Sequence, residues 1–386
     1  MYLTNKEEMA LKGEYGEAQQ IAYRILYAIG NGANADRLME AKTSHISGVN
    51  YHNIGDAGLD LLEDMAKTAR FVIPTTINPC GVQVSPPIHL NFKQDLYEKQ
   101  ERILAAFAKM GSRGSYTCIP YEYDNVANMG DHVSWAESSA VVYGNSVLGI
   151  MTNRESGLSA LASAITGKTP HYGLHLEEKR RAKEWVLVDT PLNDEVDYGI
   201  LGYYIGKNFK DTVGIVGLRA PTKMQLKSLS AAIATSGPMG MFVQDEHIPT
   251  SSYIRFGKEE YNATRAILDK SEEGQAILLG CPFMGYNELK HLAEALTGKR
   301  FTKPTYLFTS HSVYGSAAAE GIIISIEKSG AKVVQDACPS LSYIPELIGA
   351  TKIVTSSTKG SFYMAASSKV AIELLSLDEI IRKYTA

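Results

Sequence analysis

The clearest hydrophobic pattern in the chain is a series of short apolar runs separated by helical sequence between residues 276 and 362. Four runs, 276–280, 305–309, 332–336 and 351–355, each end in polar or small residues. This alternation predicts βαβ units and a parallel sheet. Because ligands bind where parallel strands end, we expect one edge of this sheet to carry Cys281-Pro282, Ser310-His311-Ser312, Cys338-Pro339 and Ser356–Ser361.

Apolar spacing predicts several further elements in the rest of the chain. Helices are expected at 18–29, 58–69, 99–110, 156–165 and 222–234, and strands at 71–76 and 185–189. The apolar run 140–149 is interrupted by Gly144-Asn145-Ser146. That interruption indicates either polar groups held against a ligand or a β-bulge. The hydroxyl-rich turn around Gly48 is either a surface loop or a place where backbone approaches a ligand.

The length of 386 residues suits two or three α/β domains. We expect an N-terminal α/β region at 1–140, a middle α/β domain at 141–270 and a C-terminal βα domain at 271–386. The formal net charge of −4 gives no electrostatic case for nucleic acid or an anionic membrane, so an anionic ligand must be held by local groups. The polar N-terminus does not resemble a signal peptide, and no apolar run is long enough for a membrane helix. We therefore expect a cytoplasmic protein.

The four cysteines are widely separated and include no C-x-x-C pair: Cys80, Cys118, Cys281 and Cys338. This spacing does not fit a zinc ribbon, a thioredoxin motif or a secreted disulfide framework. Proline follows Cys281 and Cys338 directly and Cys118 two residues later, a context known from iron–sulfur ligands. Buried, purely structural cysteines are the alternative.

Taken together, the motifs of the chain resemble the large subunit of the aconitase X family, and within it the archaeal two-subunit phosphomevalonate dehydratases. The similarity runs nearly end to end. It rests on six motifs, 44–51 (SHISGVNY), 117–121 (TCIPY), 144–146 (GNS), 280–282 (GCP), 336–339 (DACP) and 357–360 (STKG). Relatives often have His and Cys soon after the position of Cys281, where this chain has Phe283-Met284-Gly285. They often have Thr before the position of Cys338, where this chain has Ala337.

The resemblance implies a [4Fe-4S] cluster held by Cys118, Cys281 and Cys338. It also implies an aconitase-like multi-domain α/β/α architecture with parallel-sheet βα units, in which the swivel domain is a separate small subunit. That subunit is expected to provide the catalytic base, a serine; in the present chain His45 is a possible base. The implied substrate-binding residues are Gly48, Val49, Asn50, Asn78, Pro79, Asn145, Ser146 and Lys359.

The activity that the resemblance implies is that of a hydro-lyase of the mevalonate pathway to isoprenoids. Such an enzyme dehydrates (R)-5-phosphomevalonate to trans-anhydromevalonate 5-phosphate, and the partner of this chain would be the small subunit. One alternative within the family is a cis-3-hydroxy-L-proline dehydratase. Another, from a different class, is a metal-free α/β protein that binds a phosphorylated ligand and whose cysteines are merely buried. The motif 356–361 (SSTKGS) fits an anion site on physical grounds, because it offers hydroxyls, backbone N–H groups and an ammonium at a strand-to-helix junction.

Overall fold

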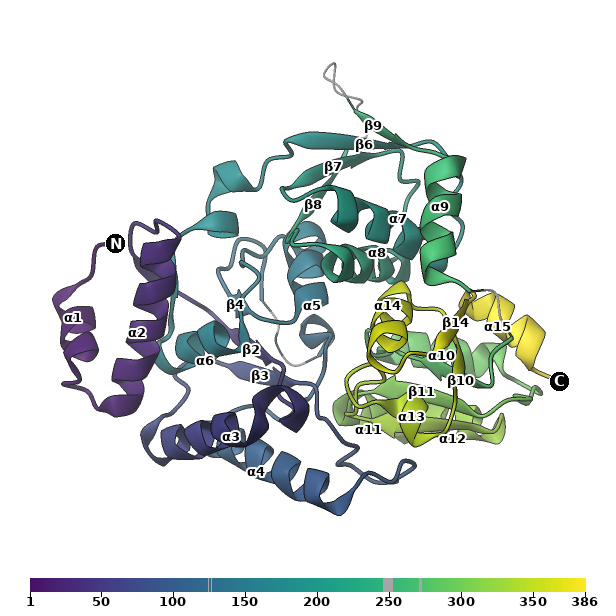
Figure 1. Ribbon diagram of the computed structural model, residues 1–386, viewed down its shortest axis with the longest axis horizontal. Coiled ribbons are helices and arrows are strands. Elements are labelled where there is room, and N and C mark those ends of the chain that lie inside the picture. The colour runs from purple at the N-terminus through teal and green to yellow at the C-terminus, as the bar shows by residue number, and fades with distance from the viewer. Residues whose placement is uncertain (124, 126, 246–252, 271–272) are drawn as a thin grey trace. The chain divides into compact units, whose positions relative to one another are not determined.

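The computed structural model describes residues 1–123, 125, 127–245, 253–270 and 273–386 (Figure 1). The chain forms two compact units. Unit 1 comprises Met1–Pro79 and Gln94–Arg181, and unit 2 comprises Cys80–Lys93 and Ala182–Ala386.

Unit 1 is built around a small parallel sheet with the strand order β3-β2-β4. Helix α6 packs on β2 and β4, α2 packs on α6, and α3 and α4 pack on each other. The elements of this unit are α1 (Asn5–Lys12), α2 (Glu17–Gly32), β1 (Leu38–Glu40), β2 (Ser44–Ser47), α3 (Tyr51–Thr68), β3 (Thr75–Asn78), α4 (Gln94–Met110), η1 (Pro120–Glu122), β4 (Ser134–Trp135), α5 (Ser138–Tyr143), the π-helix η2 (Gly144–Leu148), α6 (Gly157–Thr166), β5 (Lys168–Pro170), η3 (Gly173–His175) and η4 (Glu177–Lys179).

The first part of unit 2 contains a four-stranded parallel sheet with the order β8-β7-β6-β9. Helices α7 and α8 pack closely on each other, where Gly202 of α7 lies against the α8 backbone so tightly that a Cβ would meet Leu229 O at 2.4 Å. The elements are β6 (Glu184–Val188), α7 (Glu195–Asn208), β7 (Val213–Val216), α8 (Lys223–Ser236), β8 (Phe242–Asp245), β9 (Ile254–Phe256) and α9 (Lys258–Leu268).

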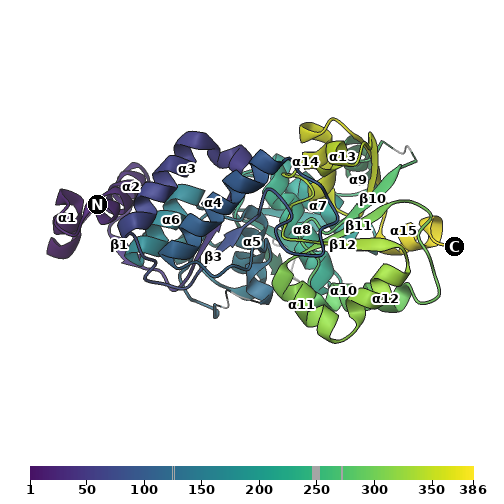
Figure 2. The same cartoon turned by 90° about the horizontal axis from the view of Figure 1, so that it is seen from below.

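The second part of unit 2 is a five-stranded parallel sheet with the order β12-β11-β10-β13-β14. Figure 2 shows α10, α11 and α12 on one side of this sheet and α14 on the other. Its elements are β10 (Ala276–Leu279), α10 (Tyr286–Ala295), β11 (Thr305–Thr309), α11 (His311–Ala319), α12 (Ile322–Lys328), β12 (Ala331–Gln335), α13 (Ile344–Leu347), β13 (Lys352–Thr355), α14 (Thr358–Ser367), β14 (Ala371–Leu374) and α15 (Leu377–Tyr384).

The strands of the five-stranded sheet of unit 2 are buried on both faces, in agreement with their continuous apolar sequences. Alternate strand residues Ile277, Leu279, Leu307, Val333 and Val354 pack with apolar side chains of α10, α11, α12 and α15 in one core cluster. The strands carry apolar residues on both faces because helices cover both faces, which is why they read as continuous apolar runs. The four strands predicted between 276 and 355 are confirmed, as is the α/β class with parallel sheets.

The structure shifts one predicted strand and excludes one of two alternatives. Of the strand predicted at 71–76, only Thr75 and Thr76 belong to a strand, β3. The backbone N–H groups of Phe71 and Val72 donate to Met110 O and Ala164 O at helix ends instead of to a strand. The run 140–149 contains no β-bulge but helix α5 and the π-helix η2. The Glu137 side chain starts this helix by accepting a hydrogen bond from Ser139 N.

The two units also differ from the expected division at 1–140, 141–270 and 271–386. Residues 141–181 lie in unit 1, because α6 packs on β2 and on α2. Residues 182–386 form unit 2 together with the 80–93 segment. In the part of the chain that the structure describes, no helix has the length and apolar character needed to cross a membrane.

Candidate functional site

In unit 2 the chain direction across the second sheet reverses between β10 and β13. From β10 the chain proceeds to β11 and β12 on one side, and β13 and β14 lie on the other side. Such a topological switch point opens a crevice at the carboxyl ends of the strands, which is where ligands of open α/β sheets bind. Cys281 follows β10 and Ser356–Lys359 follow β13, so the two motifs flank this switch point.

The turn at Cys281 is held directly against the start of α14. Ser357 Oγ donates a hydrogen bond to Cys281 O and also caps α14 by accepting from Gly360 N at 2.8 Å. A Cβ at Gly360 would lie 3.4 Å from Cys281 Cβ, so the absence of a side chain lets the helix approach the cysteine. Gly280 has φ = 106°, and a side chain there would meet Phe308 O at 2.4 Å. The local sequence therefore positions the Cys281 thiol at the switch point.

Cys338 lies in a loop that a buried carboxylate fixes. Asp336, with φ = 69°, is fully buried; its Oδ1 accepts from His311 N at 2.9 Å and its Oδ2 accepts from Ser85 Oγ at 2.8 Å. The segment 80–93 is further joined to this loop by a parallel bridge between Cys80 and Ala337. These bonds hold the backbone on the N-terminal side of Cys338.

The two thiols and Lys359 influence one another electrostatically. Burial raises the pKa of Cys338 to about 12, the charge of a Cys281 thiolate raises it as well, and the Lys359 ammonium opposes the shift. Cys281 Sγ also lies 3.5 Å from Ser340 Oγ. The predicted residues Cys281, Cys338 and Lys359 are thus brought together in unit 2.

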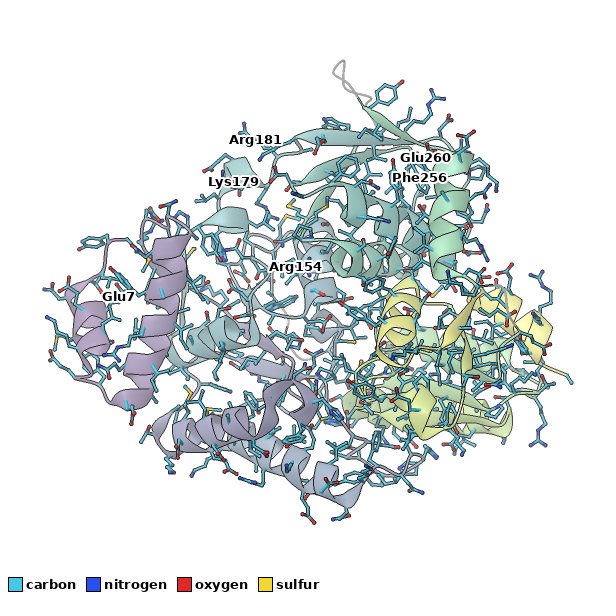
Figure 3. The ribbon with its side chains drawn as sticks, viewed as in Figure 1. Glu7, Arg154, Lys179, Arg181, Phe256 and Glu260 are labelled. Atoms are coloured by element: carbon cyan, nitrogen blue, oxygen red, sulfur yellow. The ribbon has the colours of Figure 1, made fainter. Side chains whose placement is uncertain are left out.

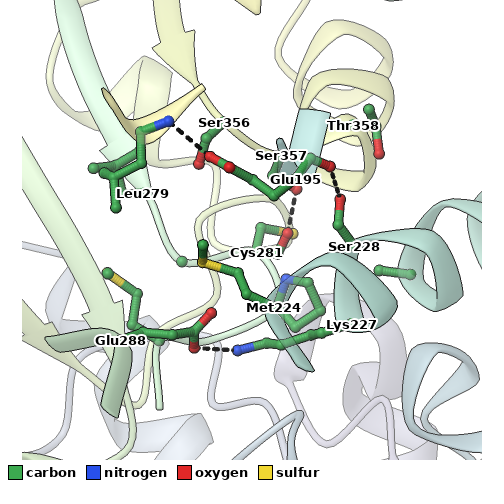
Figure 4. A pocket seen from close by; sticks show the side chains of 15 residues that line it. Glu195, Met224, Lys227, Ser228, Leu279, Cys281, Glu288, Ser356, Ser357 and Thr358 are labelled. Carbon is green, nitrogen blue, oxygen red and sulfur yellow. Dashed lines mark hydrogen bonds and ion pairs between the residues drawn. The ribbon is translucent and has the colours of Figure 1, made fainter. Parts of the chain in front are cut away.

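A cavity of about 60 Å³ opens beside Cys281, lined by residues of α7, α8, the Gly280–Pro282 turn and the Ser356–Thr358 turn (Figure 4). It is small beside the ~300–1,000 Å³ of ordinary ligand pockets. Lys227 Nζ on its wall donates to Phe283 O at 2.7 Å and pairs with Glu288. Glu195 also lines the cavity. Its carboxylate accepts a hydrogen bond from Leu377 N, and burial raises its pKa to about 7.

In unit 1 the predicted residues of the first two loops lie side by side. Ser47 of β2 pairs with Asn78 of β3, and Val49 N donates to Asn78 O at 3.0 Å. Gly48 has φ = 85°, a conformation that favours glycine. Asn50 is fully buried and caps α3, and its Nδ2 has no hydrogen-bond partner in the described residues. Because buried donors are normally satisfied, Asn50 Nδ2 is suited to a ligand oxygen.

The third predicted loop is held by internal bonds. Asn145 is buried in η2; its Nδ2 donates to Thr152 O at 2.8 Å, and its Oδ1 accepts from Thr152 N and from Arg180 Nη1. A substrate contact by this side chain would have to displace one of these bonds. Ser146 is half-buried in the same element. Their substrate role stays a prediction.

His45, considered as a possible base, is fully buried in β2. Its Nδ1 lies 2.7 Å from Thr76 Oγ1, and burial lowers its pKa to about 4, while Glu137 and Asn78 oppose that shift. The ring is fully buried, and its Nε2 has no hydrogen-bond partner in the described residues, so a catalytic role for His45 stays a prediction. Through Nδ1 the ring takes part in the polar network between β2 and β3.

The remaining two cysteines differ in environment. Cys118 lies in unit 1, half-buried in the loop before η1, where Ile119 N donates to Thr117 Oγ1. Cys80 is fully buried, and burial raises its pKa well above the ordinary value. A buried thiol of this kind fits the structural alternative for Cys80.

The donor set of unit 2 fits an iron–sulfur cluster in its chemistry. Cys281 and Cys338 offer two thiols, the ligands that such clusters take, and bound cations stabilise the thiolate form that burial disfavours. Within the ranges that the structure describes, no group of three or more His, Cys, Asp and Glu side chains is arranged to hold a metal ion. Unit 2 therefore offers two thiols of the kind that such a cluster takes, and Cys118 of unit 1 is the third ligand that the resemblance implies.

Sequence reasoning predicted no role for three buried carboxylates beside these loops, Glu137, Glu195 and Asp336, although Asp336 belongs to the motif 336–339. Glu137 and Asp336 each follow a strand end, and this position is a signal that could have identified them. Glu195 follows the helix cap Asp194 and looks like an ordinary first-turn acid, so its burial is visible only in the structure.

Comparison with known proteins identifies the family of this chain. Models of the aconitase X family match almost the whole chain, with the first domain at residues 1–178, the second at 182–273 and the third at 274–386. Among curated proteins, the phosphomevalonate dehydratase large subunit of Methanosarcina mazei is 41% identical over 89% of this chain and 87% of its own. The chain belongs to the aconitase X family.

Other members of the aconitase X family support this assignment. The phosphomevalonate dehydratase large subunit of Methanocaldococcus jannaschii is 37% identical over 99% of this chain and 100% of its own. The crystal structure of Thermococcus kodakaraensis aconitase X in the holo-form superposes with a TM-score of 0.91 at 36% identity and covers 100% of both chains. The cis-3-hydroxy-L-proline dehydratase of Pseudomonas aeruginosa is 31% identical over 92% of this chain, but only 65% of its own length is covered.

Proposed function

We propose that this chain is the large subunit of a phosphomevalonate dehydratase of the mevalonate pathway. The enzyme removes water from (R)-5-phosphomevalonate and yields trans-anhydromevalonate 5-phosphate. The observation that carries the proposal is similarity over nearly the full length to several large subunits of that name, at 34–41% identity. The cis-3-hydroxy-L-proline dehydratases are less similar, at 30–31% identity, which favours the phosphorylated substrate.

We further propose a [4Fe-4S] cluster with Cys118, Cys281 and Cys338 as its ligands. With three protein ligands, the bound cluster supplies an iron with open positions, a Lewis acid towards the substrate hydroxyl and carboxylate. Support comes from the Cys281 thiol at the switch point of unit 2, from the Cys338 thiol that interacts with it, and from the family to which the chain belongs. Cys80 is not assigned, because its thiol is fully buried beside Ala337.

The chain's own residues bind and orient the substrate in this proposal. Lys359 and the hydroxyl-rich turn at the start of α14 hold an anionic group, because an ammonium and backbone N–H groups at a helix N-terminus favour anions. The Gly48–Asn50 and Asn78–Pro79 loops contact the rest of the substrate, with Asn50 Nδ2 as a hydrogen-bond donor; Asn145 and Ser146 remain assigned to the same task. The proton α to the carboxylate is removed by a serine of a small swivel-domain subunit, as the family resemblance implies.

A direct assay of both candidate substrates tests the function. The chain is produced anaerobically with its small subunit and offered (R)-5-phosphomevalonate and cis-3-hydroxy-L-proline separately. We expect dehydration of the phosphorylated substrate with a preference of at least ~10⁴-fold in kcat/KM, because a site built around a phosphate leaves buried donors unpaired when the phosphate is missing. Turnover of the proline derivative alone would overturn the proposal.

A further inference from the structure

The carboxylate of Glu137 joins the ends of all three strands of the central sheet of unit 1. Its Oε2 accepts from Ser47 Oγ of β2 at 3.2 Å and from Asn78 Nδ2 of β3 at 3.0 Å. Its Oε1 accepts from Ser139 Oγ at 2.8 Å and Ser139 N at 3.4 Å. Glu137 itself follows β4 by two residues and is only 8% exposed.

This carboxylate lies at the switch point of the unit 1 sheet. The chain passes from β2 to β3 on one side, whereas β4 lies on the other side of β2. The Ser47–Glu137 bond spans that point, where a ligand crevice is expected. The residues it holds are the immediate neighbours of Gly48–Asn50 and include Asn78, all of which are assigned to the substrate.

The chemistry of a carboxylate also selects one orientation of the Asn78 amide. An ionised carboxylate only accepts hydrogen bonds, so it faces the NH₂ group of Asn78 and turns Oδ1 away. The Asn78 backbone is fixed at the same time, because its carbonyl accepts from Val49 N. A neutral amide in place of the carboxylate would accept or donate and would no longer discriminate between the two orientations.

We propose that Glu137 is a positioning residue, which sets the Asn78 amide and the turn at Gly48 for substrate binding. The inference rests on the proposed function, since it assumes that these loops contact the substrate. Its structural alternative is a simple helix cap, because Glu137 also caps α5. A cap needs only the bonds to Ser139, whereas the proposal depends on the bonds to Ser47 and Asn78.

The test compares Glu137→Gln with Glu7→Gln in the complex with the small subunit. Glu7 is a matched control in unit 1: it is 6% exposed and accepts a hydrogen bond from Thr4 N, at the residue that caps α1 (Figure 3). We expect Glu137→Gln to raise KM for phosphomevalonate about tenfold to a hundredfold with unchanged iron content, and Glu7→Gln to leave KM unchanged. A Ser47→Ala variant should be non-additive with Glu137→Gln, because both remove the same bond. Equal KM values in Glu137→Gln and wild type, or full additivity, would overturn the proposal.

Hydrogen exchange provides a readout that does not depend on the substrate. Peptides that cover residues 46–52 and 76–80 should exchange faster in Glu137→Gln than in wild type, and at the wild-type rate in Glu7→Gln. Unchanged exchange in these peptides overturns the positioning role even if the enzyme is active. If instead the wild type fails to dehydrate phosphomevalonate but exchange changes as expected, the proposed function fails and the positioning of the loops stands.

Discussion

The sheets of unit 1 and of the second part of unit 2 are built alike, but different chemistry holds the loops at their switch points. In unit 1 one carboxylate, Glu137, gathers hydroxyl and amide donors, and the histidine nearby, His45, is buried and neutral. In unit 2 the ion pair of Lys227 with Glu288 supports the turn after Cys281, and Glu195 lines the same cavity.

The difference predicts opposite responses to pH. Burial lowers the pKa of His45 to about 4, so folding of unit 1 disfavours protonation. Burial raises the pKa of Glu195 to about 7, so folding of unit 2 disfavours ionisation. Unit 1 should therefore lose stability in acid and unit 2 on approach to neutrality. The chain has two tryptophans, Trp135 in unit 1 and Trp185 in unit 2, so single-tryptophan backgrounds can follow each unit separately.

Breaking the ion pair of unit 2 should have the largest effect on stability. Lys227 and Glu288 side chains are 7% and 20% exposed. Removing one partner of a buried pair leaves a charge uncompensated, which costs about 3–5 kcal/mol. Lys227→Met should lower the free energy of unfolding of unit 2 by this amount in urea titrations of Trp185 fluorescence. The double variant Lys227→Met/Glu288→Leu should recover most of the loss; a single variant that loses less than ~1 kcal/mol would refute the role of the pair.

Glu195→Gln should make the free energy of unfolding of unit 2 less dependent on pH. The folded-state pKa of about 7 lies above the ordinary value of 4.5. The wild type is therefore relatively most stable below pH 4.5 and loses about 3 kcal/mol as the pH rises to about 7. The variant cannot ionise and should not show this loss. Urea titrations at several pH values measure it, and parallel pH profiles for the two proteins would contradict the assignment.

His45→Gln should weaken the loss of stability that unit 1 shows in acid. In the folded state the pKa of His45 is about 4, below the ordinary value of 6.5. The stability of wild-type unit 1 is therefore not reduced by this residue above pH 6.5. About 3 kcal/mol is then lost as the pH falls towards 4. Trp135 fluorescence should report acid destabilisation of unit 1 in the wild type and a weaker dependence in the variant. If wild-type unit 1 instead became more stable as the pH fell, the proposed difference between the two units would be wrong.

Lys359→Ala is expected to have the smallest effect in free energy and to separate substrate binding from cluster binding. Loss of one charge-assisted hydrogen bond is worth about 1.5–3 kcal/mol, which corresponds to a rise in KM of roughly tenfold to a hundredfold. Iron content should fall much less. Lys290→Ala, an exposed position on α10, serves as the control. An equal loss of iron in Lys359→Ala would assign the residue a structural role instead.

The strands of the second sheet of unit 2 could be predicted because helices cover both of its faces, which makes the apolar runs continuous. The start of β3 at Thr75 could not, because Phe71 and Val72 bond to helix ends that are distant in sequence. The same holds for the site. Cys281, Cys338 and Lys359 follow strands, so the sequence pattern could predict them. Glu137 could not be predicted in this way, because its hydrogen-bond partners Asn78 and Ser47 lie 59 and 90 positions away in the sequence.

Iron and sulfide analysis of the anaerobically prepared complex tests the central claim most directly. We predict about four irons and four sulfides per large subunit in the wild type and in Cys80→Ala. Cys118→Ala, Cys281→Ala and Cys338→Ala should each lose most of both. A wild-type complex without iron, or iron that disappears in Cys80→Ala and persists in Cys118→Ala, would contradict the account.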